Sequence, residues 1–282
     1  MTDECTPGGQ SGGVHVSGGM VHATWSFLRL VLLSYLMTSG VTSARAQDKN
    51  PQVPPCQPLE MMRLVYEGDL TKALAKSKEC AASSNADIDS MSKSDPPNPW
   101  LSLAISKAGY YLCVEAQILA MMGSLSEAES ALSHAEAFAL SHPDYLLTSD
   151  GMNSIAWRQL VSTTKGFLLE KKGDFKGARL KYLNGHKDDR LALLALNEKD
   201  MAEAWSRARA SAGVATSIAV LGALYELDGD DANAFLSYSE AQKLMEDSFK
   251  PGHNDFMPMN LSECQRVSDG LRRLGTVRHR SH

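Results

Sequence analysis

Apolar residues recur every three to four positions from about residue 59 to about residue 247, a spacing that places them on one face of an α-helix. Short breaks, most of them centred on a glycine, separate these segments. Alternating apolar and polar residues, which would indicate strands, are scarce, and no hairpin-turn dipeptide joins such segments. The pattern therefore predicts an all-α protein.

Two longer breaks interrupt the helical pattern. Residues 83–99 are polar and end in a run with three prolines, and residues 142–151 mix proline, glycine and polar side chains. Because proline has no N–H to donate, we expect both segments to be loops. Residues 248–262 are also irregular, and a last short helix that caps the array is expected at residues 261–274.

The first 46 residues differ from the rest of the chain. Residues 1–24 are rich in glycine and serine, and the apolar run at residues 25–37 carries one charge, Arg29. The segment ends in a small residue, an arginine and Ala46, a pattern that signal peptidase accepts. The apolar run is shorter than the ~20 residues of a membrane span. We therefore expect a signal peptide, cleavage after Ala46, and a periplasmic or secreted protein.

Two points about this leader stay open. No lysine or arginine precedes the apolar run, and a start at Met20 would give a leader of ordinary length. Alternatively, the segment is not cleaved and anchors the protein, which is the only membrane contact expected. Residues 47–58, which follow, are rich in proline and are expected to form a linker without helix.

A glycine followed by a short polar residue and a new helical segment recurs four times. The four glycines are Gly68, Gly123, Gly173 and Gly229. An alanine lies five residues after each glycine, at Ala73, Ala128, Ala178 and Ala234. A small residue lies twelve after it, at Cys80, Ala135, Gly185 and Ala241. This spacing suits two antiparallel helices, because small residues let the backbones approach and glycine accepts the left-handed turn between them. The polar residue after the glycine can cap the second helix.

The pattern resembles the tetratricopeptide repeat. The copy around Gly229 fits best, with Gly222 before it and Tyr238 after it, and the copy at Gly68 fits least. The glycines are 50 to 56 residues apart, against about 34 in the family. Residues 188–212 repeat the offsets weakly and are interpreted as an extra, short hairpin. The resemblance implies a solenoid of about five irregularly spaced helical hairpins over residues 59–247.

The resemblance also implies a binding surface. In tetratricopeptide solenoids the first helix of each hairpin lines the concave face. Here that face would carry Tyr110, Gln117, Met121, Thr163, Phe167, Glu170, Lys171 and Glu226. The mixture of apolar and polar groups suits an extended peptide or a partner helix. The alternative is that Met121 and Phe167 belong to the core.

Four cysteines remain after the leader with Cys5 is removed, in a chain expected in an oxidising compartment. Cys56 precedes the first hairpin and Cys80 lies near the expected end of its second helix. Since antiparallel helices bring those ends together, a Cys56–Cys80 disulfide is expected, with free thiols as the alternative. Cys113 is expected to be buried in a helix, and Cys264 is left open, with pairing to Cys113 as one option.

Composition and motifs limit the classes of function that the sequence supports. A formal net charge of −5 gives no electrostatic reason to bind nucleic acid, and the basic run at Arg272, Arg273, Arg278 and Arg280 is interpreted as a solvated tail. The sequence contains no phosphate-binding loop, zinc-helix motif or Cys-x-x-Cys. We therefore expect no enzyme activity, cofactor or metal.

The sequence favours an exported scaffold that binds a protein or peptide. A structural repeat module of the cell envelope that associates with itself is the alternative. A third option, an enzyme or ligand site in the 83–99 segment, is disfavoured because no reactive constellation is present. Neither the partner nor the oligomeric state can be read from the sequence.

The leader makes a direct prediction. N-terminal sequencing of protein exported by its own cells should begin at Gln47, because signal peptidase cuts after the small residue Ala46. Intact residues 20–46 on the exported protein would contradict cleavage and favour the anchored alternative.

Overall fold

The computed structural model divides the chain into two units, residues 1–47 and residues 48–282. It describes residues 56, 58–94, 98–147, 152–248, 250 and 257–278, all of which belong to the second unit. The expected signal peptide, the Met20 start, the cut after Ala46 and nearly all of the linker at residues 47–58 lie outside the described residues. Residues 279–282, with Arg280, also lie outside the described residues. The expected solvated tail is wrong for Arg272 and Arg273, which lie in the last helix, where Arg273 pairs with Glu226.

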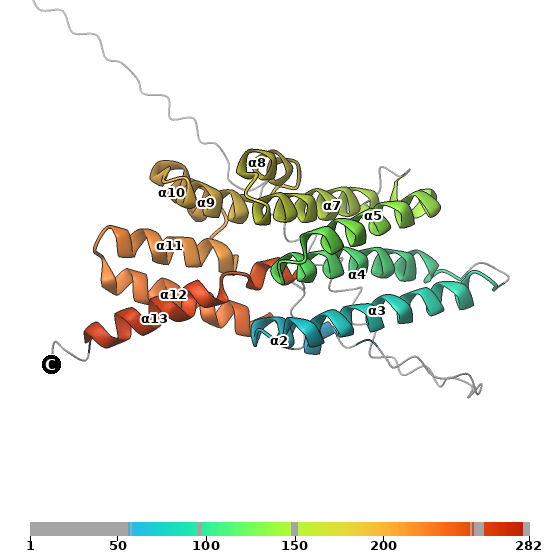
Figure 1. The fold of residues 1–282 in the computed structure, drawn as a ribbon, viewed down its shortest axis with the longest axis horizontal. Coiled ribbons are helices and arrows are strands. Elements are labelled where there is room, and N and C mark those ends of the chain that lie inside the picture. Colours follow the sequence, from blue (N-terminus) through green and yellow to red (C-terminus); the bar gives the residue numbers. More distant parts are fainter. Residues whose placement is uncertain are drawn as a thin grey trace, which may run out of the picture. The chain divides into compact units, whose positions relative to one another are not determined.

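Every regular element in the described ranges is a helix, which confirms the all-α class (Figure 1). The elements are α2 (Pro58–Tyr66), α3 (Leu70–Met91), α4 (Leu101–Met121), α5 (Leu125–Ser141), α6 (Pro143–Leu146), α7 (Met152–Lys171), α8 (Phe175–Asn184), α9 (Asp188–Asn197), α10 (Met201–Ala210), α11 (Ala215–Leu227), α12 (Asp231–Asp247), the 3-10 helix η2 (Pro258–Leu261) and α13 (Cys264–Arg278).

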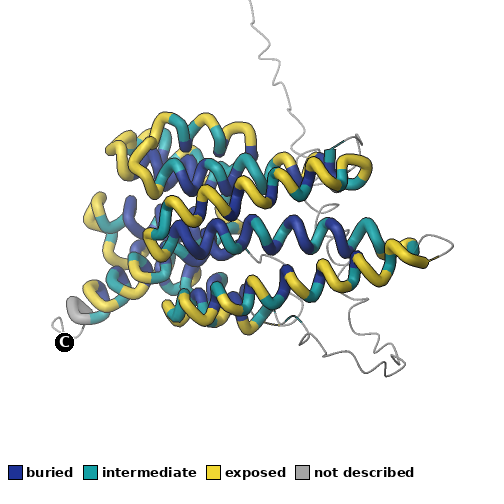
Figure 2. The backbone as a smooth tube through the Cα atoms, turned by 45° about the vertical axis from the view of Figure 1, so that its right-hand side comes forward, coloured by how far each residue is buried: buried dark blue, intermediate teal, exposed yellow. Residues whose placement is uncertain are grey.

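Ten of these helices form five hairpins, each closed by a three-residue turn: α2–α3, α4–α5, α7–α8, α9–α10 and α11–α12. Each hairpin packs on the next, through α3 on α4, α4 and α5 on α7, α8 on α9, and α9 and α10 on α11. The helix α13 packs on α12. Buried positions lie along the sides of the helices that face other helices, and exposed positions lie on the opposite sides (Figure 2).

The five turns share one backbone conformation. The repeated glycines have positive φ, 81° at Gly68, Gly123 and Gly173 and 76° at Gly229. The turn of the fourth hairpin has Lys199 in the glycine's place, with φ 63°. In all five, the N–H after this residue donates to the carbonyl five residues earlier, which closes the end of the first helix. The short hairpin at residues 188–212 therefore has the same turn without the glycine.

Aspartates begin the second helix in four of the five hairpins. The side chains of Asp69, Asp174, Asp200 and Asp230 each accept a hydrogen bond from the N–H three residues later. Ser124 makes no such bond, so the expected cap is missing in the second hairpin. These caps satisfy backbone donors that a helix start leaves unpaired.

Small residues in the first helix receive the tyrosine of the second. A Cβ on Gly166 would lie 2.7 Å from Cδ1 of Tyr182, and one on Gly222 would lie 2.8 Å from Cδ1 of Tyr238. Both tyrosine side chains are fully buried or nearly so. Glycine is therefore required at both positions because the aromatic ring fills the space of a side chain.

Three expected boundaries are wrong. The helix α3 continues to Met91, so residues 83–91 are not a loop, because Ala81, Ser84 and Ile88 form a buried stripe on this helix. Residues 143–146 form the short helix α6, which begins with a proline where no N–H is needed. The last helix runs from residue 264 to 278, and the 3-10 helix η2 precedes it.

A disulfide joins Cys56 to Cys80, with their Cα atoms 4.5 Å apart. Cys80 lies in the middle of α3 and not at its end, so the bridge fastens the residues before α2 to the centre of the next helix. Cys113 is a free, fully buried thiol and Cys264 is a free, half-buried one. The option of a Cys113–Cys264 pair is therefore wrong.

The glycine–tyrosine contacts predict a difference between two glycines. Gly222→Ala should lower the free energy of unfolding by roughly 1–3 kcal/mol, because the new methyl group overlaps Tyr238. Gly275→Ala in α13 meets no atom within 4 Å and should be neutral or stabilising by up to about 1 kcal/mol, since alanine favours helix. Urea unfolding followed by circular dichroism measures both, and equal effects would contradict the packing argument.

Candidate functional site: the inner helix face and the segment that fills it

The eight residues expected on an open binding face divide into two groups. Gln117, Thr163 and Phe167 are at most 2% exposed. The others keep some exposure: Tyr110, Met121, Glu170, Lys171 and Glu226. Gln117, Thr163 and Phe167 are interior residues, so the expectation that they line an open groove is wrong. The alternative, that Phe167 belongs to the core, is confirmed. Met121 packs at the edge of the core.

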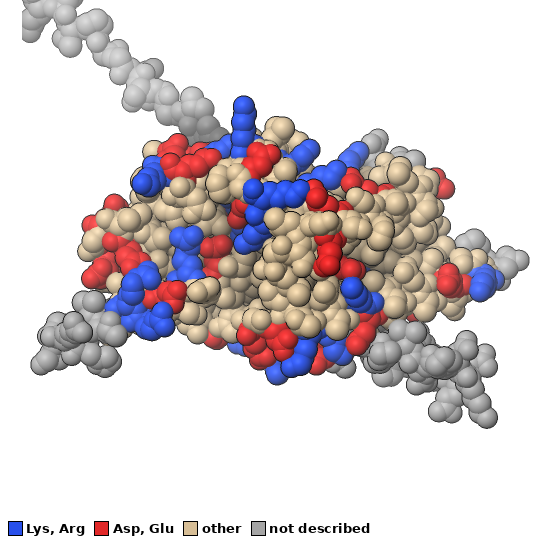
Figure 3. Space-filling view, in the orientation of Figure 1, with Lys and Arg blue, Asp and Glu red and all other residues tan. Residues whose placement is uncertain are grey.

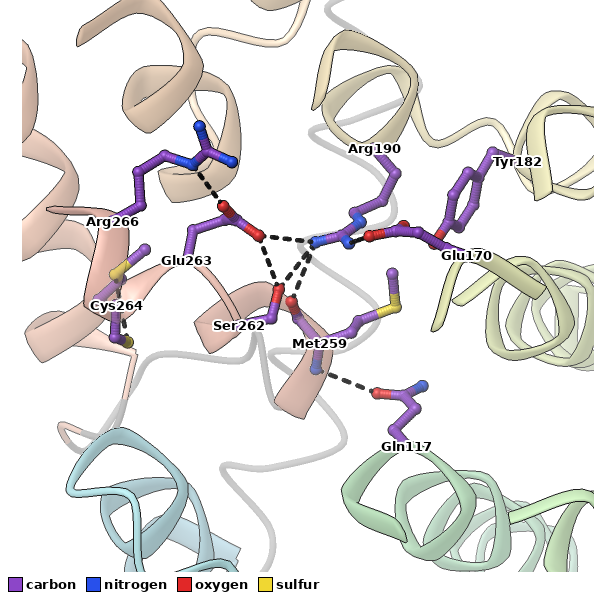
Figure 4. Close-up of polar contacts among 10 residues, drawn as sticks. Gln117, Glu170, Tyr182, Arg190, Met259, Ser262, Glu263, Cys264 and Arg266 are labelled. Atoms are coloured by element: carbon purple, nitrogen blue, oxygen red, sulfur yellow. Dashed lines mark hydrogen bonds and ion pairs between the residues drawn. The ribbon is translucent and has the colours of Figure 1, made fainter. Parts of the chain in front are cut away.

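The space beside these residues is filled by the protein's own 3-10 helix η2. All four of its residues are buried, and it packs against α2, α4 and α11. The N–H of Met259 donates to Oε1 of Gln117 over 3.3 Å. The guanidinium of Arg190 donates to the carbonyl of Met259 over 3.4 Å. Side chains of α4 and α9 thus hold the main chain of η2 as a groove would hold a bound peptide (Figure 4).

Arg190 is the centre of a buried polar network. Its guanidinium forms an ion pair with Glu170, donates to Oγ of Ser262 over 2.9 Å, and lies 3.8 Å from a carboxylate oxygen of Glu263. Its side chain has no exposed surface. It also stands over the ring of Phe167, 5.2 Å from the ring centre. One cation therefore joins α7, α9 and the start of the C-terminal segment.

The carboxylate of Glu170 has a second donor. The hydroxyl of Tyr182 donates to it over 2.6 Å. Burial raises the pKa of Tyr182 well above its usual value, and the negative Glu170 adds to this shift while Arg190 opposes it. Burial would lower the pKa of Arg190, but Glu170 and Glu263 outweigh it and raise that pKa. The tyrosine therefore remains a neutral donor and the arginine remains charged.

Glu263 completes the charge balance. Burial alone would raise its pKa, but the guanidiniums of Arg190 and Arg266 outweigh burial and hold the pKa below its usual range. A carboxyl with a depressed pKa stabilises the folded state above its unfolded pKa, about 4. That contribution is lost as the pH falls through the depressed value. The network contains one buried cation between two carboxylates, an arrangement that joins the elements that carry them.

A similar arrangement recurs in the last hairpin. The hydroxyl of Tyr238 donates to Glu226 over 3.0 Å, and Arg273 of α13 donates to both oxygens of that carboxylate over 2.9 Å. In both hairpins the glutamate follows the packed glycine by four residues and precedes the tyrosine by twelve. The side chain of Arg273 is 54% exposed, whereas that of Arg190 has no exposed surface. We call these two sets the inner and outer triads.

Sequence reasoning placed both glutamates on the binding face and missed their partners. The glycine, glutamate and tyrosine have a constant spacing that could have identified half of each triad. The arginines have no constant spacing from the glutamates, since Arg190 follows Glu170 by 20 residues and Arg273 follows Glu226 by 47. Each arginine lies on the helix after its hairpin, so only the tertiary packing defines it.

Burial governs the two free cysteines among the described residues. Burial raises the pKa of the Cys113 thiol to about 12 and that of the Cys264 thiol to about 12, so neither forms the thiolate that nucleophilic chemistry needs. Within the described ranges, no three His, Cys, Asp or Glu side chains gather as metal ligands would. Across the same residues, no helix is both long enough and apolar enough to cross a membrane.

Comparison with known proteins gives no relative. No protein-family model, no curated protein sequence and no solved structure matches this chain.

The two triads predict unequal losses of stability. Arg190→Met should lower the free energy of unfolding by roughly 3–5 kcal/mol, because it removes the buried cation paired with Glu170, which is also one of the two cations paired with Glu263. Arg273→Met removes the equivalent partner of Glu226, in a pair whose arginine side chain is 54% exposed, and should cost about 1 kcal/mol or less. Urea unfolding of the two variants at neutral pH measures the difference. Similar losses would show that burial does not distinguish the triads.

Proposed function

We propose that this protein is an exported scaffold of tetratricopeptide-like hairpins that binds a protein or peptide partner and catalyses no reaction. The observation that carries the proposal is the recurrence of one hairpin design. Five consecutive helix pairs share the same left-handed turn and the same backbone closure, and each packs on the next. Stacked hairpins of this kind present extended surfaces built from many helices, and their common use is binding.

The non-catalytic part of the proposal is supported by how the ionisable groups are used. Arg190 forms ion pairs with Glu170 and Glu263, and burial keeps Cys113 a neutral thiol. Acidic and basic side chains are interspersed over the face seen in Figure 3. Such a surface favours contact with another folded surface or a peptide over capture of a polyanion.

Export is supported by two independent features. The first is the leader with its small-residue cleavage pattern before Gln47. The second is the disulfide between Cys56 and Cys80, since disulfides persist mainly in oxidising compartments such as the periplasm or the cell exterior.

The alternative is a structural module that associates with itself. It is favoured by two large apolar side chains in the last hairpin, Leu227 and Leu236, which are 66% and 60% exposed. Light scattering after size exclusion, over a range of concentrations, distinguishes a scaffold for another protein from a self-associating module. A scaffold for another protein should stay monomeric, whereas a self-associating module should form a stable oligomer without any partner.

The scaffold function is tested by reconstitution. The tagged full chain is crosslinked in its own cell envelope, recovered proteins are identified by mass spectrometry, and each is purified and titrated against the chain. We expect at least one to bind saturably with a dissociation constant of roughly 1 μM or lower. An exported helical protein with the same tag is the control bait. If no recovered protein binds saturably in purified form, the proposal is overturned.

A further inference from the structure

Two adjoining hollows lie between α5, α7 and α8, which are neighbours in Figure 1. One has a volume of ≈ 340 Å³ and opens between α5 and α7, with Leu140 at its edge. The other has a volume of ≈ 500 Å³ and opens between α7 and α8, with Ile155 and Leu183 at its edge. Arg158 and Ser162 of α7 line both. We call this surface the α5–α7–α8 groove.

Three exposed apolar side chains border the groove. Leu140 is 72% exposed, Leu183 45% and Ile155 44%. They come from three different helices and border hollows that share a wall. Single exposed leucines are common, but apolar side chains gathered around a recess and rimmed by polar groups mark an interaction site.

The charges of the groove are mainly positive. Arg158, Lys165 and Lys181 line it, against one acidic residue, Glu136. Glu136 is already paired with Lys165, at 2.6 Å. Among the described residues, no carboxylate lies within ion-pair distance of Arg158 or Lys181. The groove therefore carries a local excess of positive charge, although the net charge of the whole chain is −5. This excess favours an acidic ligand.

The walls of the groove are held in place before any partner arrives. Lys165 of α7 and Lys172, the residue after its end, form ion pairs with Glu136 and Glu129 of α5. On the other side, Oγ of Ser162 donates to the carbonyl of Lys181 over 2.9 Å, which fastens α7 to α8. A preformed surface avoids the cost of ordering side chains and helices on binding.

We propose that the α5–α7–α8 groove binds an acidic, amphipathic helical segment of the partner protein. This rests on the proposed scaffold function and names the partner's chemistry. Apolar side chains of the segment fill the two hollows beside Leu140, Ile155 and Leu183. Its aspartates and glutamates meet Arg158 and Lys181. An anionic membrane would also attract these cations, but a flat bilayer would leave both hollows unfilled, whereas apolar side chains at helical spacing fill them.

The test uses a labelled synthetic peptide with leucines at helical spacing on one face and glutamates on the other. Fluorescence anisotropy with the full chain should show saturable binding. The pair Arg158→Glu with Lys181→Glu should weaken it roughly tenfold or more, since each reversal turns attraction into repulsion. The pair Leu140→Ser with Ile155→Ser should weaken it by a similar factor.

Matched controls keep the result specific. Lys176→Glu with Lys243→Glu changes the net charge equally at exposed sites outside the groove, and Leu236→Ser removes an exposed leucine elsewhere. Both should change binding by less than about twofold. A peptide of the same composition with its leucines scrambled should bind at least roughly tenfold more weakly. Thermal unfolding of every variant confirms that the fold is kept.

Several outcomes overturn the groove proposal. These are equal binding by groove and control variants, equal binding of the scrambled peptide, or binding of phosphatidylglycerol vesicles with none of the peptide. The scaffold function is judged separately with the partner recovered from the cell envelope. If that partner binds all variants equally, the scaffold function stands and the groove proposal fails.

Discussion

The structure depends on the neutralisation of one buried charge. The guanidinium of Arg190 lies fully inside the protein, where an unpaired cation would cost many kcal/mol. It is balanced by Glu170 from the third hairpin and by Glu263 from the C-terminal segment, and it binds the main chain of Met259. Two consecutive hairpins and the C-terminal segment must therefore meet at one place. The 3-10 helix η2, which packs beside the buried Gln117, directly precedes Ser262 and Glu263 of this network.

This constraint also affects which surfaces of the hairpins are open. The inner face, where a repeat scaffold commonly binds its ligand, is filled by η2 and held closed by Gln117 and Arg190. The α5–α7–α8 groove, which lies over hairpins two and three, is open and bordered by exposed apolar side chains. The helix α7 therefore contributes buried residues to the core on one side and lines a surface recess on another.

Much of the fold could be predicted from local rules. Four glycines with positive φ and an alanine five residues later are local signals, and they located four turns and the helices around them. The turn at Lys199 was found only through weaker offsets, because lysine carries no preference for that conformation. The end of α3 was misplaced because the polar composition of residues 83–91 obscured a stripe of small buried residues, and the prolines after it suggested a longer break.

The candidate sites were harder to predict, for a physical reason. Each depends on residues whose sequence separation follows no period, such as Arg190 with Glu263, or Leu140 with Leu183. Taken alone, a buried arginine looks like a surface residue and an exposed leucine looks like a core residue. Only the packing of the hairpins against one another determines that the arginine is buried and that the leucine is exposed.

The closure of the inner face by η2 has a consequence for how the chain folds. In an array of repeats with contacts only between neighbours, each unit can fold as it appears. Here the backbone of Met259 pairs with Gln117, a residue 142 positions earlier, and η2 also packs against the first hairpin. Contacts between residues so far apart in sequence slow folding. They also couple the stability of the first hairpins to that of the C-terminal segment. During synthesis, the surfaces of α2 and α4 that pack against η2 therefore stay uncovered until η2 has been made. Packing of η2 then makes the unfolding of the first hairpins more cooperative with that of the rest of the domain.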